Sequence, residues 1–155
     1  MSSYNPNTST SKIKVLFLCT GNSARSQMAE ALLRQYAYDR FEVHSAGLEP
    51  KPLNPYTVRV MEEIDIKMSQ HHSKSVGEYL GKIHFTYLIT VCSKAEEKCP
   101  TTFLGVANRL HWPFDDPAVV TGSEEEVLAK FRQVRDQIDL RIKEWLAEQS
   151  ILLSH

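Results

Sequence analysis

A short apolar run, a loop and a helix-like run follow one another near the start of this 155-residue chain. Residues 13–18 are predominantly apolar, as expected for a buried strand, and residues 25–37 repeat apolar side chains at helical spacing. Between them lies the segment Cys19-Thr20-Gly21-Asn22-Ser23-Ala24-Arg25-Ser26. A strand-loop-helix opening constrains the chain towards an α/β fold in which this loop follows the carboxyl end of a strand.

The loop from Cys19 to Arg25 has the composition of an anion-binding site. Gly21 can adopt a positive φ angle without steric cost, so we expect successive backbone N–H groups to turn inward beside the helix N-terminus. A tetrahedral oxyanion fits such a loop, and Arg25 can hold two of its oxygens. These groups are expected to lower the pKa of Cys19 from about 8.5 into the range of roughly 3.5 to 7.5, which makes its thiolate the nucleophile. The candidate oxyanion-binding residues are Thr20, Gly21, Asn22, Ser23, Ala24, Arg25 and Ser26.

Strand-like and helix-like segments alternate along the rest of the chain. Strands are predicted at residues 41–45, 85–91 and 108–112, and helices at residues 55–64 and 124–149. Asn54 is the expected cap of the first of these helices and Pro55 its first residue. Residues 70–81 and 93–98 are expected to form loops. This order predicts a single α/β domain with a four-stranded parallel sheet flanked by helices and joined by right-handed crossovers.

Three chemically useful groups follow predicted strands. Cys19 follows the first strand, Cys92 the third and the Asp115-Asp116 pair the fourth. Ligands bind beyond the carboxyl ends of parallel strands, so we expect these groups to meet in one site. Asp116, oriented by the proline that follows it, is the candidate general acid that protonates a leaving oxygen. Ser26 is expected to donate a hydrogen bond to the Cys19 thiolate.

Composition excludes several classes of function. The chain length suits one domain, expected at residues 13–149 after a flexible polar tail of residues 1–12. The 18 basic and 19 acidic side chains give a formal net charge of −1, which shows no bias towards nucleic acid or a membrane surface. The tail lacks the features of a signal peptide, and no apolar run is long enough to span a bilayer. We therefore expect a soluble cytoplasmic monomer.

Three cysteines are too few for a disulfide framework. Zinc binding is poorly supported, because Cys92 and Cys99 are not closely spaced, and His71 and His72 are expected at the surface. No metal or bound cofactor is expected. If Cys19 forms an adduct with a reducible atom, Cys92 can attack its sulfur, release the reduced oxyanion and leave a disulfide that Cys99 then takes over.

These successive disulfides require the loop of residues 93–98 to move, because disulfide-bonded Cα atoms lie roughly 4.4–6.8 Å apart. Arsenate can be reduced in this way, whereas phosphate cannot. Hydrolysis of a phosphate ester and reduction of arsenate both remain open from these residues alone.

Three motifs together carry a resemblance to a known family. They are the segment from Cys19 to Glu30, Val91-Cys92 followed by Cys99-Pro100, and Phe114-Asp115-Asp116-Pro117. They resemble the thioredoxin-coupled arsenate reductases built on the low-molecular-weight protein tyrosine phosphatase fold, over residues 12–148. The resemblance implies that Cys19 is the nucleophile, that Arg25 and residues 20–26 bind the oxyanion, and that Asp116 is the general acid. It also implies that Cys92 and Cys99 are resolving cysteines and that thioredoxin is the external reductant.

The sequence departs from the family pattern in one charged region. Some members bind potassium through residues that match Asn22, Glu30 and Ser45 together with a threonine and an aspartate. This chain has His72 and Lys74 at the last two positions. We therefore expect no bound potassium and hypothesise that the Lys74 ammonium occupies this region and supplies its charge.

Two alternatives remain beside arsenate reduction. A low-molecular-weight protein tyrosine phosphatase would use Cys19, Arg25 and Asp116 to form and hydrolyse a phosphocysteine. Residues 118–120 are aliphatic, however, where such phosphatases often carry aromatic residues, and Gln27 stands where proline is usual. Weak phosphatase activity is still expected. The second alternative is a non-enzymatic oxyanion or redox sensor that uses the same pocket, for which no partner motif is evident. Ala24 stands where many relatives of the reductase carry a further cysteine.

Overall fold

A sheet of four parallel strands in the order β2-β1-β3-β4 organises the described residues, which are 11–79, 81–98 and 106–153. The elements are β1 (Ile13–Cys19), α2 (Arg25–Ala37), β2 (Phe41–Gly47), α3 (Pro55–Glu62), the 3-10 helix η1 (Val76–Glu78), β3 (Phe85–Thr90), α4 (Ser93–Lys98), β4 (Val106–His111), the 3-10 helix η2 (Pro117–Val119) and α5 (Glu124–Leu153). This computed structural model confirms the predicted α/β fold with its parallel sheet.

Strand β1 lies in the middle of the sheet and ends at the reactive loop. It pairs with β2 from Ile13↔Phe41 to Cys19↔Gly47, and with β3 up to Leu18↔Thr90. Its residues 15–18 are fully buried, because β2 and β3 flank the strand and helices pack on both faces of the sheet. All pairings are parallel, so the carboxyl ends of the strands meet at one edge.

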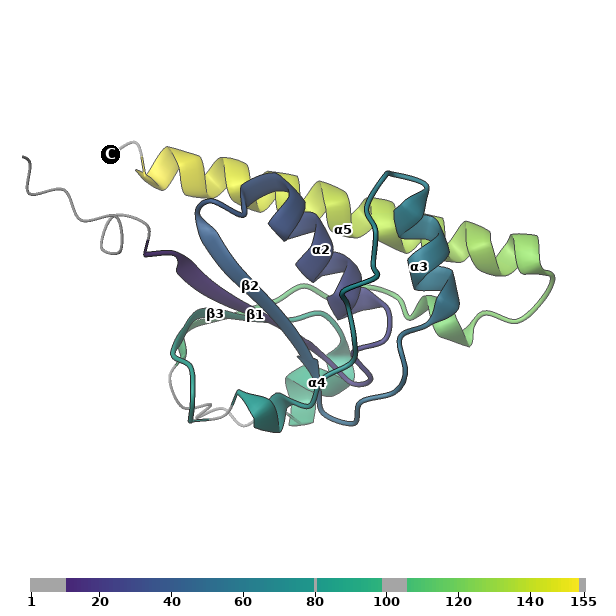
Figure 1. Ribbon diagram of the computed structural model, residues 1–155, viewed down its shortest axis with the longest axis horizontal. Helices are drawn as coiled ribbons and strands as arrows, with labels where there is room; N and C mark the ends of the chain where they lie inside the picture. The colour runs from purple at the N-terminus through teal and green to yellow at the C-terminus, as the bar shows by residue number, and fades with distance from the viewer. Residues whose placement is uncertain (1–10, 80, 99–105, 154–155) are drawn as a thin grey trace, which may run out of the picture.

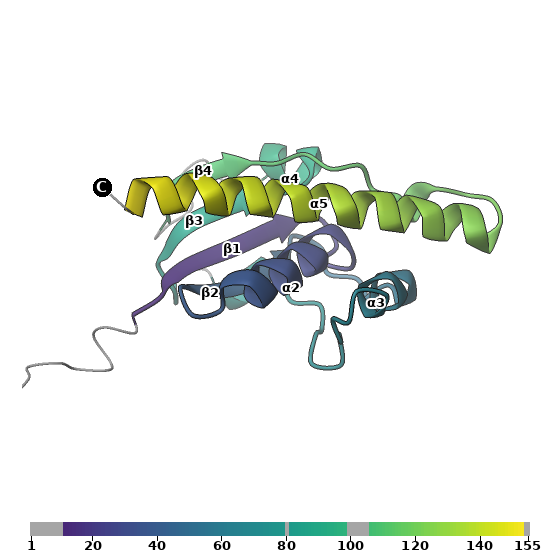
Figure 2. The same cartoon turned by 90° about the horizontal axis from the view of Figure 1, so that it is seen from above.

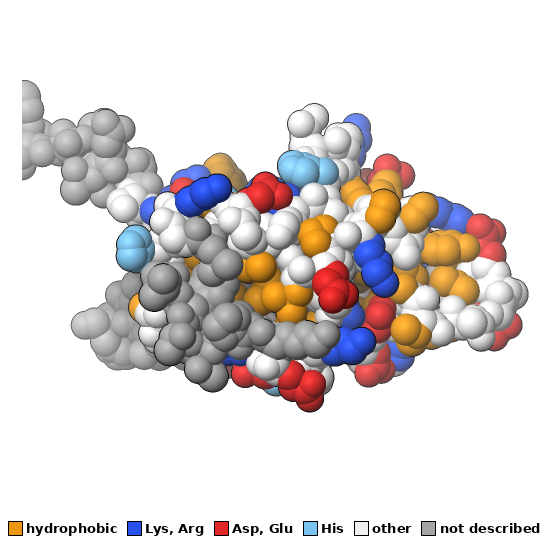
Figure 3. All heavy atoms as spheres, turned by 90° about the horizontal axis from the view of Figure 1, so that it is seen from below, with side chains coloured by type: hydrophobic (Ala, Val, Ile, Leu, Met, Phe, Trp, Pro, Cys, Tyr) orange, Lys and Arg blue, Asp and Glu red, His pale blue; other side chains and the backbone are white. Residues whose placement is uncertain are grey.

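Helices α2 and α5 cover one face of the sheet, and α4 lies on the other side (Figures 1 and 2). The apolar stripe that α5 turns to the sheet is buried. It consists of Leu128, Phe131, Val134, Ile138, Ile142 and Trp145. Helix α3 packs against α5, where Arg135 donates to the Val60 carbonyl at 2.8 Å and pairs with Glu63 at the same distance. On the face opposite α2 and α5, acidic and basic side chains are interspersed around apolar ones (Figure 3).

One predicted loop is wrong: residues 93–98 form the short helix α4. The sequence Ser-Lys-Ala-Glu-Glu-Lys contains a single apolar residue and shows no periodicity from which a helix could be predicted. In the structure the Cys92 sulfur accepts a hydrogen bond from the Ala95 N–H at 3.3 Å, so a thiol caps the helix start. Other boundaries shift less: β2 continues to Gly47, β4 spans Val106–His111 and α5 continues to Leu153.

Some sequence predictions fall outside the described ranges. These are the tail at residues 1–10 and the resolving cysteine Cys99. Among the residues that the structure does describe, no helix is both long and apolar enough to cross a membrane.

Candidate active site

The loop after β1 wraps around the Cys19 sulfur. Cys19 is 2% exposed, and its sulfur accepts a hydrogen bond from the Asn22 N–H at 3.1 Å. The Ser26 hydroxyl oxygen lies 2.8 Å from the same sulfur. Because the Asn22 amide donates to that oxygen at 2.8 Å, the Ser26 hydroxyl hydrogen is free to point at the sulfur. The predicted contact between Ser26 and Cys19 is therefore present.

The positive φ angle of the loop lies at Asn22, with φ = 52°, and not at Gly21 as predicted. Asparagine tolerates this left-handed region better than most residues, because its short polar side chain can bond locally. The Asn22 amide donates to Ser45 Oγ at 2.9 Å, and its oxygen accepts from the Lys74 N–H at 2.8 Å and from Gln27 Nε2 at 3.0 Å. A buried side chain thus holds the turn.

Gly47, opposite Cys19 across the β1–β2 pair, allows a close approach that sequence reasoning missed. A Cβ atom on Gly47 would lie 2.7 Å from the Thr20 carbonyl oxygen and 3.0 Å from the Asn22 nitrogen. No side chain fits there unless the loop moves. The glycine was visible in the sequence as the end of a strand, but only the strand register shows that it faces the loop.

Arg25 and Asp116 face each other beside the loop. The Arg25 guanidinium donates to the Phe114 carbonyl at 3.1 Å and lies 3.6 Å from Asp116 Oδ2. The other Asp116 oxygen accepts from the Ala118 N–H at 2.9 Å and caps helix η2, which begins at Pro117. As predicted, the turn that contains this proline orients the carboxylate.

A cavity of about 470 Å³ brings these groups together. It is lined by Cys19, Thr20, Gly21, Ser23, Ala24, Arg25, Lys51, Cys92, Ser93, Lys94, Phe114, Asp116 and Ala118. Two predicted loop residues, Asn22 and Ser26, do not line it but are fully buried. Lys51 and Lys94 were not predicted as site residues. Their only sequence signal is a position shortly after Gly47 and Cys92.

Cys92 enters this cavity from the N-terminal end of α4. It is 3% exposed, and its sulfur lies 3.4 Å from the Thr20 hydroxyl oxygen, one residue after Cys19. The two cysteines therefore line the same cavity, and both are free thiols.

Burial raises the pKa of the Cys19 thiol above its ordinary value. The Ser26 hydroxyl, the N–H groups of Asn22 and Ser26 and the Arg25 charge act in the opposite direction but do not outweigh it. The predicted lowering of this pKa is therefore wrong for this structure. The reason is that burial disfavours the charged thiolate more than these groups favour it.

The sequence also matches a family model along nearly its whole length. The model describes the low molecular weight phosphotyrosine protein phosphatases and matches residues 14–151. The chain belongs to this family. In this chain, Cys19 and Arg25 at the two ends of the loop and Asp116, the aspartate before Pro117, line one cavity at the edge of the parallel sheet.

Relatives within this family include arsenate reductases. The arsenate reductase of Bacillus subtilis (strain 168) is 45% identical over 131 residues, which cover 84% of this chain and 93% of that protein. A solved arsenate reductase in its phosphate-binding state superposes with a TM-score of 0.73 at 28% identity, covering 88% of this chain and 98% of that one. A thioredoxin-dependent arsenate reductase of Corynebacterium glutamicum superposes with a TM-score of 0.66 at 29% identity, covering 93% of this chain and 64% of that one.

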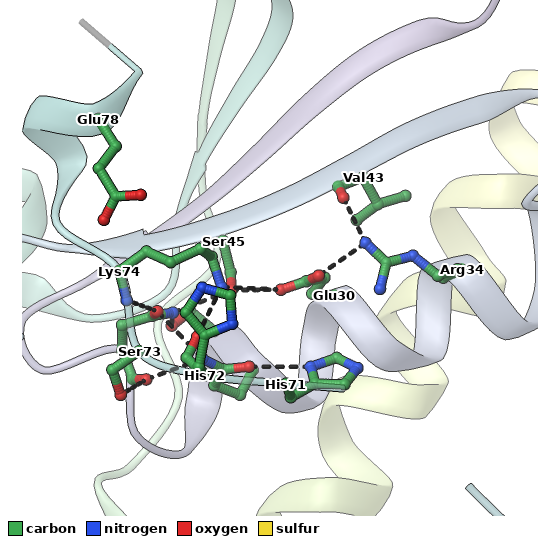
Figure 4. Close-up of polar contacts among 12 residues, drawn as sticks. Glu30, Arg34, Val43, Ser45, His71, His72, Ser73, Lys74 and Glu78 are labelled. Carbon is green, nitrogen blue, oxygen red and sulfur yellow. Dashed lines mark hydrogen bonds and ion pairs between the residues drawn. The ribbon is translucent and has the colours of Figure 1, made fainter. Parts of the chain in front are cut away.

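Behind the loop of this family member lies a buried carboxylate, Glu30, between two cations (Figure 4). Arg34 donates to it at 2.7 Å, and the Lys74 ammonium lies 3.7 Å away on the other side. Glu30 also accepts a short hydrogen bond from Ser45 Oγ, which in turn accepts from Asn22. Burial lowers the pKa of Lys74, and the charge of Glu30 opposes this. The position hypothesised for the Lys74 ammonium is confirmed, and its role in place of potassium remains a prediction.

His71 is not the surface residue that the sequence suggested. Its ring is half-buried, and Nδ1 lies 2.9 Å from Gln27 Oε1 (Figure 4). Burial lowers the pKa of this histidine. The Gln27 amide donates to the Asn22 carbonyl at 3.1 Å and to the His72 carbonyl at 2.9 Å, so the segment after α3 supports the loop. His72 is exposed, as expected.

Proposed function

We propose that this chain reduces arsenate to arsenite through a relay of Cys19, Cys92 and Cys99. The observation that carries this proposal is that Cys92 lines the same cavity as Cys19 and Arg25. A phosphatase needs no second thiol at this place, whereas a reductase does. The names of the B. subtilis and C. glutamicum relatives support arsenate as the substrate.

In the first step the loop N–H groups and Arg25 hold arsenate, whose oxygens replace Asp116 as partners of the guanidinium. The Cys19 thiolate attacks arsenic, so that an S–As bond forms and an As–O bond breaks. Asp116 in its acid form donates the proton with which the departing oxygen leaves as water. Lys51 and Lys94 at the cavity add positive charge that attracts the anion.

In the second step the Cys92 thiolate attacks the Cys19 sulfur. The S–As bond breaks, and its electron pair remains on arsenic, so As(V) becomes As(III) while the two thiols become a disulfide. The Cys99 thiolate then attacks Cys92 and frees Cys19. In helical form, the six residue steps from Cys92 to Lys98, the residue before Cys99, span about 9 Å. Disulfide-bonded Cα atoms lie roughly 4.4–6.8 Å apart, so we propose that α4 unwinds during this exchange.

Thioredoxin is the proposed reductant of the Cys92–Cys99 disulfide, because the C. glutamicum relative is named as thioredoxin-dependent. Its dithiol supplies the two electrons and is itself oxidised to a disulfide. This scheme needs no bound cofactor or metal ion on the chain. A reducing compartment keeps the three thiols ready, and we propose the cytoplasm as the location.

The test is arsenite release with thioredoxin, thioredoxin reductase and NADPH, comparing wild type with Cys92→Ser and Cys99→Ser. Both variants are expected to lose at least 99% of steady-state turnover. Their hydrolysis of p-nitrophenyl phosphate, which needs only Cys19, Arg25 and Asp116, should persist and serves as the control for folding. Variants that release arsenite like wild type would remove the relay. Glutaredoxin with glutathione, run in parallel, identifies the electron donor.

Slow hydrolysis of small phosphate esters is the second activity that the site supports. Cys19, Arg25 and Asp116 are shared by both reactions and lie at one cavity. Ala118 lines that cavity next to Asp116, so no aromatic side chain at this position packs against a substrate ring. We therefore propose hydrolysis as a side activity.

A further inference from the structure

Helix α4, which starts directly after Cys92, is tied to the sheet by the side chain of Glu96. One carboxylate oxygen accepts a hydrogen bond from the Thr90 hydroxyl at 2.5 Å, and the other lies 3.5 Å from Arg109 Nε. Thr90 ends β3, and Arg109 belongs to β4. A single side chain thus connects the helix to two strands.

The backbone of the same helical turn is held as well. Arg109 donates through Nη2 to the Glu96 carbonyl at 2.9 Å, and the Glu96 N–H donates to the Cys92 carbonyl at 3.2 Å. His111 Nδ1 lies 2.8 Å from the Thr90 oxygen. Since the Thr90 hydroxyl gives its hydrogen to Glu96, the His111 ring donates through Nδ1, a tautomer inferred from the network. Side chains from two strands, β3 and β4, therefore meet at Glu96.

Within residues 93–97, the side-chain burial that could stabilise this helix is small. A six-residue helix is unstable in isolation, and of residues 93–97 only Ala95 is fully buried. Ser93, Lys94 and Glu97 are exposed. The polar contacts of Glu96 therefore add to the Ala95 burial and the Cys92 cap that hold α4 in place.

We propose that Glu96 is a latch that keeps α4 wound and thereby holds Cys92 in the cavity, and that opening the latch lets Cys92 leave it. Glu96 touches no reacting atom in this proposal. It is a positioning residue that acts on Cys92 through the helix. In the proposed relay, opening allows Cys92 to turn from Cys19 towards Cys99. Only this turn of Cys92 towards Cys99 rests on the proposed function. The contacts of Glu96 are present in the structure in which Cys92 is a free thiol.

The test is the variant Glu96→Ala in the absence of arsenate. Alanine is the best helix former, so this change raises the intrinsic helix propensity of α4 while it removes the latch. Alkylation of Cys92 by iodoacetamide, followed by peptide mass spectrometry, is expected to become at least tenfold faster. Hydrogen exchange of the α4 amides should accelerate in parallel, while alkylation of Cys19 stays within twofold of wild type.

The matched control is Glu97→Ala, an exposed neighbour in the same helix, which should behave like wild type. A second latch variant, Thr90→Val, keeps the volume of the buried side chain and removes only its hydroxyl, and it should act like Glu96→Ala. Equal Cys92 alkylation in Glu96→Ala and Glu97→Ala would overturn the proposal. Faster alkylation of both Cys19 and Cys92 would overturn it too, because it would indicate general loosening. No arsenate is present, so these results do not depend on the proposed function.

Discussion

Ser26 sets how readily the Cys19 thiol loses its proton. Burial already raises this pKa, and the Ser26 hydroxyl is the strongest of the groups that lower it. We predict that Ser26→Ala raises the pKa further, so that the pH profile of Cys19 alkylation moves to higher pH. Loss of one hydrogen bond to a thiolate makes alkylation about tenfold slower at pH 7.

Ser123→Ala is the control for this variant. Ser123 accepts a hydrogen bond from the Glu126 N–H at the start of α5, far from the cysteine in sequence. The Ser123→Ala variant should be slightly less stable than wild type and keep the wild-type pH profile of Cys19 alkylation. An unchanged profile in Ser26→Ala would mean that the hydroxyl does not stabilise the thiolate.

A second prediction at the residue scale concerns the close approach at Gly47. Gly47→Ala places a methyl group 2.7 Å from the Thr20 carbonyl, so the loop has to move. We expect a loss of about 1–3 kcal/mol in the free energy of unfolding. Because the displaced loop holds the oxyanion, phosphate should inhibit arsenate turnover at least tenfold more weakly. Gly77→Ala is the matched control, because its methyl group would meet the Ser75 oxygen at an ordinary 3.5 Å. Equal effects of the two substitutions in urea unfolding and inhibition assays would contradict this account.

Residue identities predicted the main groups of the site and the contact of Ser26 with Cys19, but not most of its other supports. Cys19, Arg25 and Asp116 were recognisable because few side chains combine a nucleophile, a fixed cation and a proton donor. The left-handed turn was assigned to Gly21 and not to Asn22, because glycine offers the simpler explanation of a positive φ angle. Lys51 lines the cavity because of the path of the turn after β2, and the spacing of residues in the sequence does not predict that path.

At the scale of elements, the segment before η1 is tied to α2 by the contact of Lys74 with Glu30. Because a cation is built in, we predict that arsenate turnover is the same in potassium chloride and sodium chloride of equal ionic strength. Lys74→Gln leaves the buried Glu30 with Arg34 as its cation, and should lower the free energy of unfolding by about 1–3 kcal/mol.

Lys67→Gln, which alters an exposed lysine near this segment, should leave stability within about 0.5 kcal/mol of wild type. Urea unfolding and steady-state assays measure both quantities. A wild-type activity that rises sharply and specifically with potassium would refute the built-in cation.

The elements differ in how well their sequences predicted them. Helix α3 follows its signals closely, because Asn54 accepts from the Tyr56 N–H at 2.8 Å and Pro55 begins the helix. Helix α4 gave no such signal, since it depends on contacts from Thr90 and Arg109 that lie elsewhere in the chain. Long-range polar contacts are invisible to periodicity, and α4 was therefore expected as a loop.

For the whole molecule, the packing of α3 on α5 makes stability depend on pH. Hydrogen bonds from Arg132, together with Arg135, lower the pKa of Glu63 to about 2. Because the pKa of Glu63 is lower in the folded than in the unfolded state, its carboxylate stabilises the fold at pH values above its unfolded pKa of 4.5. This contribution is lost as the pH falls towards 2. We predict that wild type is more stable than Glu63→Gln at pH 7 and that the difference disappears by about pH 2.

Urea unfolding at several pH values measures this difference. The exposed neighbour Glu62 supplies the control, and Glu62→Gln should follow wild type throughout. A difference between wild type and Glu63→Gln that grows towards acid would contradict the assignment.

The overall architecture followed from the alternation of apolar strands and amphipathic helices. Because parallel strands end at one edge, the positions of Cys19, Cys92 and Asp116 after three different strands were enough to predict a shared site, and all three line one cavity. The position of Cys99 lies outside the described residues, so its part in the relay rests on chemistry and on the family resemblance.

The central claim is that Cys92 releases arsenite from the Cys19 adduct, and a single turnover without thioredoxin tests it most directly. Reduced wild-type protein is mixed with excess arsenate, and arsenite and disulfides are then quantified. We predict about one arsenite per chain, a Cys92–Cys99 disulfide and a free Cys19 thiol, with no arsenite from Cys92→Ser. Equal arsenite release by wild type and Cys92→Ser, or none from wild type until a reductant is added, would contradict the claim.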